Sequence, residues 1–312
     1  MIPFEYRTPK NLKEVHASLK EFGADAKLIS GGTALVIMMK QRLVRPSCLV
    51  SLRSVRGFNG IELKDGCLSI GGFATHRSVE SSPLVRRRLP MLAETYHHVA
   101  TLRVRNMATV GGGLAHADPN QDPPPSLIAL GATVKATSAN GSRVIPLDEF
   151  FKGYYETVLN PDEIITEVMV PKLAANTGAA YIKFLPRTAD DYATVSAAAV
   201  LTLDKTKKTI ADVRIALGSV GETPIRATDA EAILRGQPLK TEAFAAAGEK
   251  AKEAVDPVSD FRGSAAYKKD MAAVFVRRAL ERALADIRQQ AKTKNAPKPA
   301  KQKSVKKKGK RK

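Results

Sequence analysis

Two glycines between an apolar strand and a helical segment place the strongest constraint on how this chain can fold. The apolar run 26–30 predicts a buried strand, Gly31 and Gly32 follow it, and residues 34–42 have helical spacing. Glycine has no Cβ, so another group can approach the backbone closely. A helix that starts after such a turn offers N–H groups that favour an anion. The turn is a candidate phosphate site, although tight strand-to-helix turns also carry paired glycines for structural reasons alone.

A second glycine segment, Thr109-Val-Gly-Gly-Gly113, is followed by small residues and by a proline-rich turn at 118–125. Three consecutive glycines predict a loop whose backbone packs against a flat, charged group, with Asp118 and Asp122 as nearby acceptors. A glycine-rich crossover with turn-forming aspartates is an equal alternative. Neither glycine segment matches the G-x-G-x-x-G or P-loop pattern, so an ordinary Rossmann or ATPase assignment has no support.

The periodicity of the first half predicts two subdomains. Residues 1–57 read as a βαβ unit, in which a helix starts with Thr8 as N-cap and Pro9 in its first turn. Residues 58–174 read as a mixed or antiparallel sheet. It is built from hairpins at 60–73 and 133–146, a strand at 163–171, and helices at 78–81 and 90–101.

The second half predicts a separate C-terminal domain at 175–290. Apolar runs at 179–185, 195–204 and 210–217 indicate an antiparallel sheet, and three helices are expected at 227–235, 241–254 and 264–289. We therefore expect an α+β protein with a two-subdomain ligand-binding fold over 1–174, followed by a C-terminal antiparallel sheet with helices.

The C-terminal segment 291–312 is strongly basic. It contains ten lysines, one arginine and no acidic residue, so the remaining chain carries only +8 of the formal net charge of +19. With almost nothing apolar to bury, this segment is expected to be a disordered tail. Weak attraction to nucleic acid or anionic lipid is the alternative. The absence of Trp and an aromatic content of 5% argue against a base-stacking surface.

Cysteine and histidine usage restricts the metal chemistry. The chain has only Cys48 and Cys67, whereas an iron–sulfur cluster usually takes four thiolates, so this chain cannot build one alone. Its five histidines show no zinc-ligand spacing. No apolar run reaches the roughly 18 residues of a membrane span, and the N-terminus lacks a secretory pattern. A cytoplasmic location is expected.

Together, the two glycine segments are more specific than either one. Gly31-Gly32-Thr33 and Thr109-Val-Gly-Gly-Gly113 lie 78 residues apart and resemble the two flavin-binding motifs of FAD subunits of molybdenum hydroxylases. The resemblance covers roughly residues 1–288. It includes Asp-Glu-Ile-Ile at 162–165 and the block at 183–195, which has Lys183, Phe184, Arg187 and Asp190 in the family's order.

The resemblance implies which residues hold FAD. The first segment would wrap the pyrophosphate with Lys27, Leu28, Ile29, Ser30, Gly31, Gly32, Thr33, Ala34 and Leu35. The second would line the other side of the cofactor with Thr109, Gly112, Gly113 and Ala115. Asp122 would accept a hydrogen bond from a ribityl or adenosine-side hydroxyl. Ile165 would pack on the isoalloxazine ring, and Lys183 would lie near its polar edge and stabilise an anionic reduced flavin. The alternatives are a core role for Ile165 and a surface charge for Lys183.

The resemblance also implies an electron-transfer role. Substrate would react at a molybdenum cofactor on a large partner subunit, and electrons would pass through [2Fe–2S] clusters of a small subunit to FAD on this chain. The complex would be a dimer of heterotrimers, and no catalytic acid, base or metal ligand is expected here. The alternatives are a self-sufficient FAD-dependent oxidoreductase and a basic nucleic-acid-binding protein.

Overall fold

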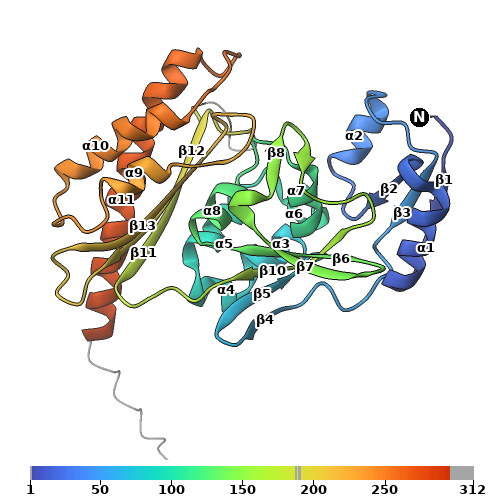
Figure 1. Ribbon diagram of the computed structural model, residues 1–312, viewed down its shortest axis with the longest axis horizontal. Helices are drawn as coiled ribbons and strands as arrows, with labels where there is room; N and C mark the ends of the chain where they lie inside the picture. Colours follow the sequence, from blue (N-terminus) through green and yellow to red (C-terminus); the bar gives the residue numbers. More distant parts are fainter. Residues whose placement is uncertain (1, 187, 189–190, 296–312) are drawn as a thin grey trace, which may run out of the picture.

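Three β-sheets follow one another along the chain in the computed structural model, which describes residues 2–186, 188 and 191–295 (Figure 1). The first sheet has three parallel strands, the second has five antiparallel strands and the third has four antiparallel strands. Figure 1 shows them in a row, with the N-terminal unit in blue at one end and the C-terminal unit in orange at the other. The second sheet and its helices therefore lie between the other two units.

The N-terminal unit is the predicted βαβ arrangement with one additional strand. Its strands, in the order β1-β3-β2, are β1 (Glu5–Arg7), β3 (Cys48–Ser51) and β2 (Ala26–Ile29), and its helices are α1 (Leu12–Phe22) and α2 (Leu35–Lys40). A 3-10 turn (Gly23–Asp25) follows α1. Val15 and Leu19 of α1 pack with Cys48 and Val50 of β3 in a small core.

The predicted start of α1 at Thr8 and Pro9 is wrong. The N-cap is Asn11, whose Oδ1 accepts a hydrogen bond from the Glu14 N–H at 3.0 Å. The Glu14 carboxylate in turn accepts from the backbone N–H of Lys10 at 2.8 Å. This reciprocal capping satisfies N–H groups that Thr8 would leave exposed.

The second sheet has the order β4-β5-β10-β6-β7, with β10 in its centre. Its strands are β4 (Ile61–Lys64), β5 (Cys67–Gly71), β6 (Thr133–Ser138), β7 (Gly141–Pro146) and β10 (Ile164–Val170). Both predicted hairpins are confirmed, with Ile61 opposite Ile70 and Val134 opposite Ile145. A 3-10 turn (Leu147–Glu149) and a two-stranded ribbon, β8 (Phe151–Gly153) and β9 (Glu156–Thr157), lead from β7 toward β10.

Six short helices connect β5 to β6, more than the sequence predicted. They are α3 (His76–Ser81), α4 (Pro83–Arg88), α5 (Pro90–His97), α6 (Leu102–Met107), α7 (Val110–His116) and α8 (Pro123–Ala129). The expected helix 90–101 ends at His97, and the expected proline-rich turn is wrong from Pro123 onward, because α8 accepts prolines in its first turn. The glycine segment expected to be a loop is also wrong, since it forms α7 with Thr109 as N-cap.

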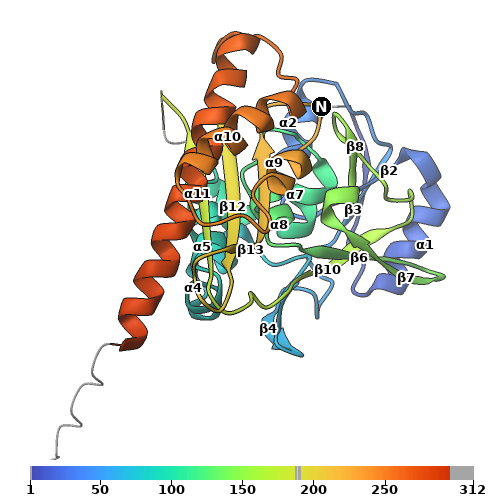
Figure 2. The same ribbon diagram turned by 60° about the vertical axis from the view of Figure 1, so that its left-hand side comes forward.

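The third sheet carries the C-terminal core. Its strands are β11 (Thr177–Phe184), β12 (Val195–Leu203), β13 (Ile210–Gly218) and β14 (Ile225–Arg226), and its helices are α9 (Thr228–Ala232), α10 (Glu242–Ala251) and α11 (Ala265–Asn295). A 3-10 turn (Lys252–Ala254) follows α10. Phe244 and Phe275 pack against Ala199 and Ile215 of the sheet. Figure 2 shows the long α11 crossing this sheet.

The expected α+β class, with its two sheets followed by a C-terminal antiparallel sheet and helices, is confirmed. The expected disorder from residue 291 is wrong at its start, because α11 continues to Asn295. The rest of the predicted tail, 296–312, lies outside the described residues. Within the described part of the chain, no helix is both long enough and apolar enough to cross a bilayer.

A chain that ends at Asn295 should keep its stability and the flavin content that the resemblance implies. Nine of the 17 removed residues are lysine or arginine, and Val305 is their one large apolar side chain, so they offer little to a core. We expect a change in the free energy of unfolding of less than about 0.5 kcal/mol, measured by urea titration. The flavin absorbance per mole of purified protein should be unchanged, and loss of flavin would show that the tail supports the site.

Candidate functional site

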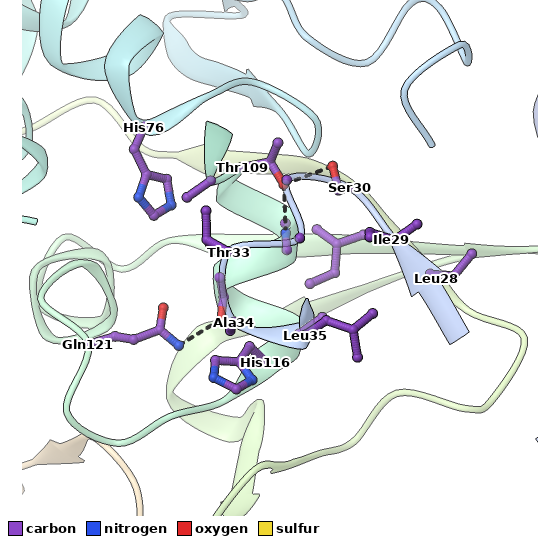
Figure 3. A pocket seen from close by; sticks show the side chains of 18 of the residues that line it. Leu28, Ile29, Ser30, Thr33, Ala34, Leu35, His76, Thr109, His116 and Gln121 are labelled. Carbon is purple, nitrogen blue, oxygen red and sulfur yellow. Dashed lines mark hydrogen bonds between the residues drawn. The ribbon is translucent and has the colours of Figure 1, made fainter. Parts of the chain in front are cut away.

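A cavity of about 630 Å³ is lined by residues of the N-terminal unit and of the second sheet with its helices (Figure 3). This volume is within the range of pockets that bind cofactors. Of the residues predicted from the sequence to hold FAD, all but Lys183 line it: Lys27, Leu28, Ile29, Ser30, Gly31, Gly32, Thr33, Ala34, Leu35, Thr109, Gly112, Gly113, Ala115, Asp122 and Ile165. The structure thus gathers segments that are far apart in the sequence around one space.

The β2–α2 turn lines this cavity with five consecutive residues whose backbone N–H groups are unpaired in the described part of the chain. The N–H groups of residues 31–35 have no hydrogen-bond partner among the described residues, and α2 has no side-chain N-cap. Gly32 has a φ of 70°, a left-handed conformation that glycine adopts without strain. Unpaired N–H groups at the start of a helix attract a negatively charged oxygen. The turn therefore has the chemistry of a phosphate-binding site.

The second glycine segment does not have this chemistry. The Val110 N–H donates to the Ala74 carbonyl at 2.9 Å and the Gly111 N–H donates to the Gly72 carbonyl at 2.7 Å. The Gly112 N–H donates to Thr109 Oγ1 at 3.2 Å. Because its first N–H groups are used inside the protein, α7 supplies the cavity with a close-packed wall rather than with anion-binding donors.

Glycines in both segments are required for packing within the protein. A Cβ on Gly31 would lie 2.0 Å from the Met107 carbonyl oxygen, and a Cβ on Gly111 would lie 2.8 Å from that of Gly72. Thr109 Oγ1 also donates to Ser30 Oγ at 3.0 Å, as Figure 3 shows. The two glycine segments therefore contact each other directly, and the absence of side chains lets the two units meet.

Asp122 and Lys183 form a buried ion pair at the cavity. Asp122 lines the cavity but is 4% exposed, and it accepts hydrogen bonds from Tyr181 Oη at 2.6 Å and Lys183 Nζ at 2.9 Å. Burial raises the pKa of the Asp122 carboxyl, against the charge of Lys183, which lowers it. Lys183 is absent from the described lining, because its ion pair with Asp122 holds it behind that residue. Its predicted place near the flavin edge stays a prediction. Arg187 and Asp190 of the same sequence block lie outside the described residues.

Several polar and aromatic lining residues had no signal in the sequence. His76 begins α3, Gln121 donates from Nε2 to the Gly113 carbonyl at 2.9 Å, and the His116 and Tyr155 rings lie 5.1 Å apart. Tyr192 also lines the cavity, and burial, together with the charge of Asp118, raises its pKa. Their positions depend on how loops that are distant in the sequence pack together. Neither the spacing of residues nor the hydrophobic periodicity of the sequence predicts such packing.

Burial strongly perturbs the His76 ring. It is 4% exposed, its Nδ1 has no partner among the described residues, and its edge faces Tyr96 with ring centroids 5.0 Å apart. Burial and the charge of Arg105 lower the pKa of His76 to about 4, although a backbone hydrogen bond to Thr109 opposes them. The imidazole is therefore neutral at pH 7, and it can donate one hydrogen bond and accept another without adding charge to the cavity.

Two family models match almost the whole chain. "FAD binding domain in molybdopterin dehydrogenase" matches residues 2–173, and "CO dehydrogenase flavoprotein C-terminal domain" matches residues 180–283. The chain belongs to the family of FAD-binding medium subunits of molybdenum hydroxylases. Its relatives are subunits of oxidoreductases. The family predicted from the two glycine segments is therefore confirmed.

Individual relatives match this chain over most of its length and most of their own. The carbon monoxide dehydrogenase medium chain of Hydrogenophaga pseudoflava is 39% identical, over 91% of this chain and 99% of its own length. The solved carbon monoxide dehydrogenase from that organism has a chain that superposes with a TM-score of 0.88 at 41% identity, covering 92% of this chain and 99% of that one. The nicotine 6-hydroxylase medium subunit of Paenarthrobacter nicotinovorans is 35% identical, over 88% of this chain and 95% of its own length.

The cavity fits the cofactor that the family name implies. The lining offers groups of the kinds that FAD takes: the unpaired N–H groups of 31–35 would suit a doubly charged pyrophosphate, and the apolar side chains of Ile165 and Leu159 would suit a flat ring. Within the described residues, no cluster of three or more His, Cys, Asp or Glu side chains could hold a metal ion. The unpaired N–H groups and the apolar lining together suit an organic anion.

The neutral state of His76 predicts a loss of stability in acid. The unfolded chain takes up a proton near pH 6.5 and the folded chain only near pH 4, so the free energy of unfolding falls as the pH decreases between these values. The full effect is about 3 kcal/mol. Urea unfolding at pH 7 and pH 4 should show this part of the pH dependence in the wild type and not in His76→Gln. Equal pH dependence in both proteins would contradict the assignment.

Proposed function

We propose that this chain carries electrons through bound FAD, from iron–sulfur clusters of a partner subunit to an external acceptor. The observation that carries the proposal is the run of unpaired N–H groups at 31–35 beside an apolar cavity. Bound FAD supplies reversible two-electron and one-electron redox chemistry. The protein contributes the binding site, the orientation of the cofactor and the exclusion of water.

Each side of the cavity has a distinct part in holding the cofactor. The backbone of 31–35 would bind the pyrophosphate, with Thr33 adding a hydroxyl, and the side chains of 27–30 would flank it. Thr109, Gly112, Gly113 and Ala115 would form the opposite wall. Ile165 would pack on the ring, and Asp122 would accept from a sugar or ribityl hydroxyl with a lone pair left by Tyr181 and Lys183.

Lys183 would then act through Asp122. Its ammonium group opposes the rise that burial causes in the pKa of Asp122, and it orients the carboxyl oxygens. This differs from a direct contact with reduced flavin. The charge of Lys183 reaches the cavity only in combination with that of Asp122, so the pair adds no net positive charge there.

The remaining redox centres would belong to partner subunits. Cys48 is buried and Cys67 is partly buried, and neither forms a disulfide. Two separate thiols cannot hold a [2Fe–2S] cluster, which supports a small iron–sulfur partner and a large partner with the molybdenum cofactor. The "medium chain" names of the relatives agree with a complex of this kind, and we propose a cytoplasmic dimer of heterotrimers.

The two alternative functions find less support. A self-sufficient oxidoreductase would differ from the relatives, whose names describe them as a medium chain or as subunits of a complex. A nucleic-acid-binding role rests on the basic segment 291–312 alone. Such binding would weaken steeply as the salt concentration rises, whereas FAD uptake in the cavity would depend much less on salt.

The pyrophosphate turn can be tested with matched glycine variants. Gly32→Val and Gly57→Val both place a branched side chain at a positive φ, but Gly57 is exposed and has open space around it. Both should lose stability, and only Gly32→Val should weaken FAD binding, by tenfold or more, on the order of one lost charge-assisted hydrogen bond. Affinity is measured by quenching of flavin fluorescence. Wild-type protein that takes up no FAD, or equal affinity in both variants, would contradict the proposal.

The electron-transfer role needs the native assembly. A tagged chain isolated from its own host should copurify with a large and a small subunit, and the complex should contain molybdenum, iron and FAD by elemental analysis and absorbance. Metals should be lost when the partners are removed, and FAD should stay with this chain. A chain that is isolated alone and turns over a substrate without partners would favour the self-sufficient alternative.

A further inference from the structure

The segment 98–101, between α5 and α6, forms part of the cavity wall through Val99 and Ala100. Three consecutive carbonyl groups of this segment are held by cationic side chains. Lys183 Nζ donates to the His98 carbonyl at 2.9 Å, and Arg105 Nη1 donates to the carbonyls of Val99 and Ala100, each at 2.8 Å. The shape of this wall thus depends on contacts from behind it.

The backbone of the segment would not keep this shape unaided. Ala100 has a φ of 37°, in the left-handed region that non-glycine residues seldom occupy. Such a conformation persists only where its surroundings fix it. Arg105 donates to the carbonyl before the Ala100 Cα and to the carbonyl after it. These two hydrogen bonds can therefore fix the strained backbone of Ala100.

Arg105 is itself anchored by a buried carboxylate. Its Nε donates to Glu80 Oε2 at 3.0 Å, and the two side chains are 9% and 4% exposed. The other oxygen, Glu80 Oε1, contacts His97 Nδ1 at 2.9 Å and Arg77 at 2.8 Å. Burial raises the pKa of Glu80, but these hydrogen bonds and the charge of Arg105 outweigh it and hold that pKa at about 2. The carboxylate is therefore charged at neutral pH.

Arg105 has no place in the described lining of the cavity, although its neighbour Val104 does. Its planar guanidinium can donate to a carboxylate and to two carbonyls at once, and a lysine ammonium reproduces this geometry poorly. Its influence on a ligand must pass through the 98–101 backbone. The role of Arg105 therefore differs from that of the lining residues, which would contact the cofactor directly.

We propose that Arg105, anchored by Glu80, is a positioning residue of the FAD site, which fixes Val99 and Ala100 as a wall against the cofactor. The inference rests on the proposed FAD binding. Removal of the guanidinium releases two carbonyls and the strained peptide, so the wall becomes mobile and the cofactor loses a preformed surface. Residues that support a binding site from behind typically change affinity by about 10-fold to 100-fold when they are replaced.

The test compares Arg105→Ala and Arg105→Lys with Arg103→Ala on the full-length chain. Arg103 lies on the same helix, is exposed, and makes no side-chain hydrogen bond or ion pair with the described residues, so it controls for loss of an arginine from α6. Arg77 and His97 remain beside Glu80 in Arg105→Ala, which limits the cost of an unpaired buried charge. Urea unfolding of the FAD-free proteins verifies that each variant is folded.

The dissociation constant for FAD should rise about tenfold or more in Arg105→Ala, rise less in Arg105→Lys, and stay at the wild-type value in Arg103→Ala. Guanidinium ion, added well below its denaturing range, should restore affinity to Arg105→Ala and leave Arg103→Ala unchanged. Wild-type affinity in folded Arg105→Ala overturns the inference. If Arg105→Ala is unfolded, Arg105→Lys decides: wild-type affinity there overturns the inference and weaker binding supports it. Failure of the wild type to bind FAD overturns the proposed function instead.

Discussion

The contact between the two glycine segments is the constraint on which the rest of the site depends. Thr109 Oγ1 donates to Ser30 Oγ, and the backbone at Gly31 lies against the Met107 carbonyl so closely that a Cβ would overlap it. This contact joins the N-terminal βαβ unit to the helices of the second sheet. Without it, the β2–α2 turn and α7 would not enclose the same cavity, and neither could form a complete binding site alone.

The two glycine segments have different tasks despite similar sequences. The β2–α2 turn leaves the N–H groups of 31–35 unpaired among the described residues. The first N–H groups of α7, in contrast, donate hydrogen bonds to the backbone of 72–74 and to Thr109. One segment thus has the unpaired donors that an anion site needs, and the other is a packing surface. Buried charges add a further constraint. Lys183 and Arg105 donate hydrogen bonds to the carbonyls of 98–100, and each also forms an ion pair with a buried carboxylate, Asp122 and Glu80 respectively.

Local patterns predicted much of this arrangement and missed what depends on tertiary packing. Alternating apolar residues and turn glycines located both hairpins of the second sheet, and the glycine pair located the β2–α2 turn. Glycine content masked the helix of α7, whose stability comes from Thr109 and from Gly72 and Ala74 across a tight contact. The ion pair of Asp122 with Lys183 joins residues 61 positions apart, so no sequence spacing could show that Lys183 lies behind Asp122.

Amide hydrogen exchange at residues 31–35, with and without FAD, tests the central claim most directly. These N–H groups have no partner in the protein and should exchange rapidly in the FAD-free chain. FAD should slow their exchange strongly, since its pyrophosphate would accept their hydrogen bonds, while the already bonded N–H groups of 110–113 should change much less. Slow exchange at 31–35 without FAD, or no change there when FAD is bound, would contradict the account.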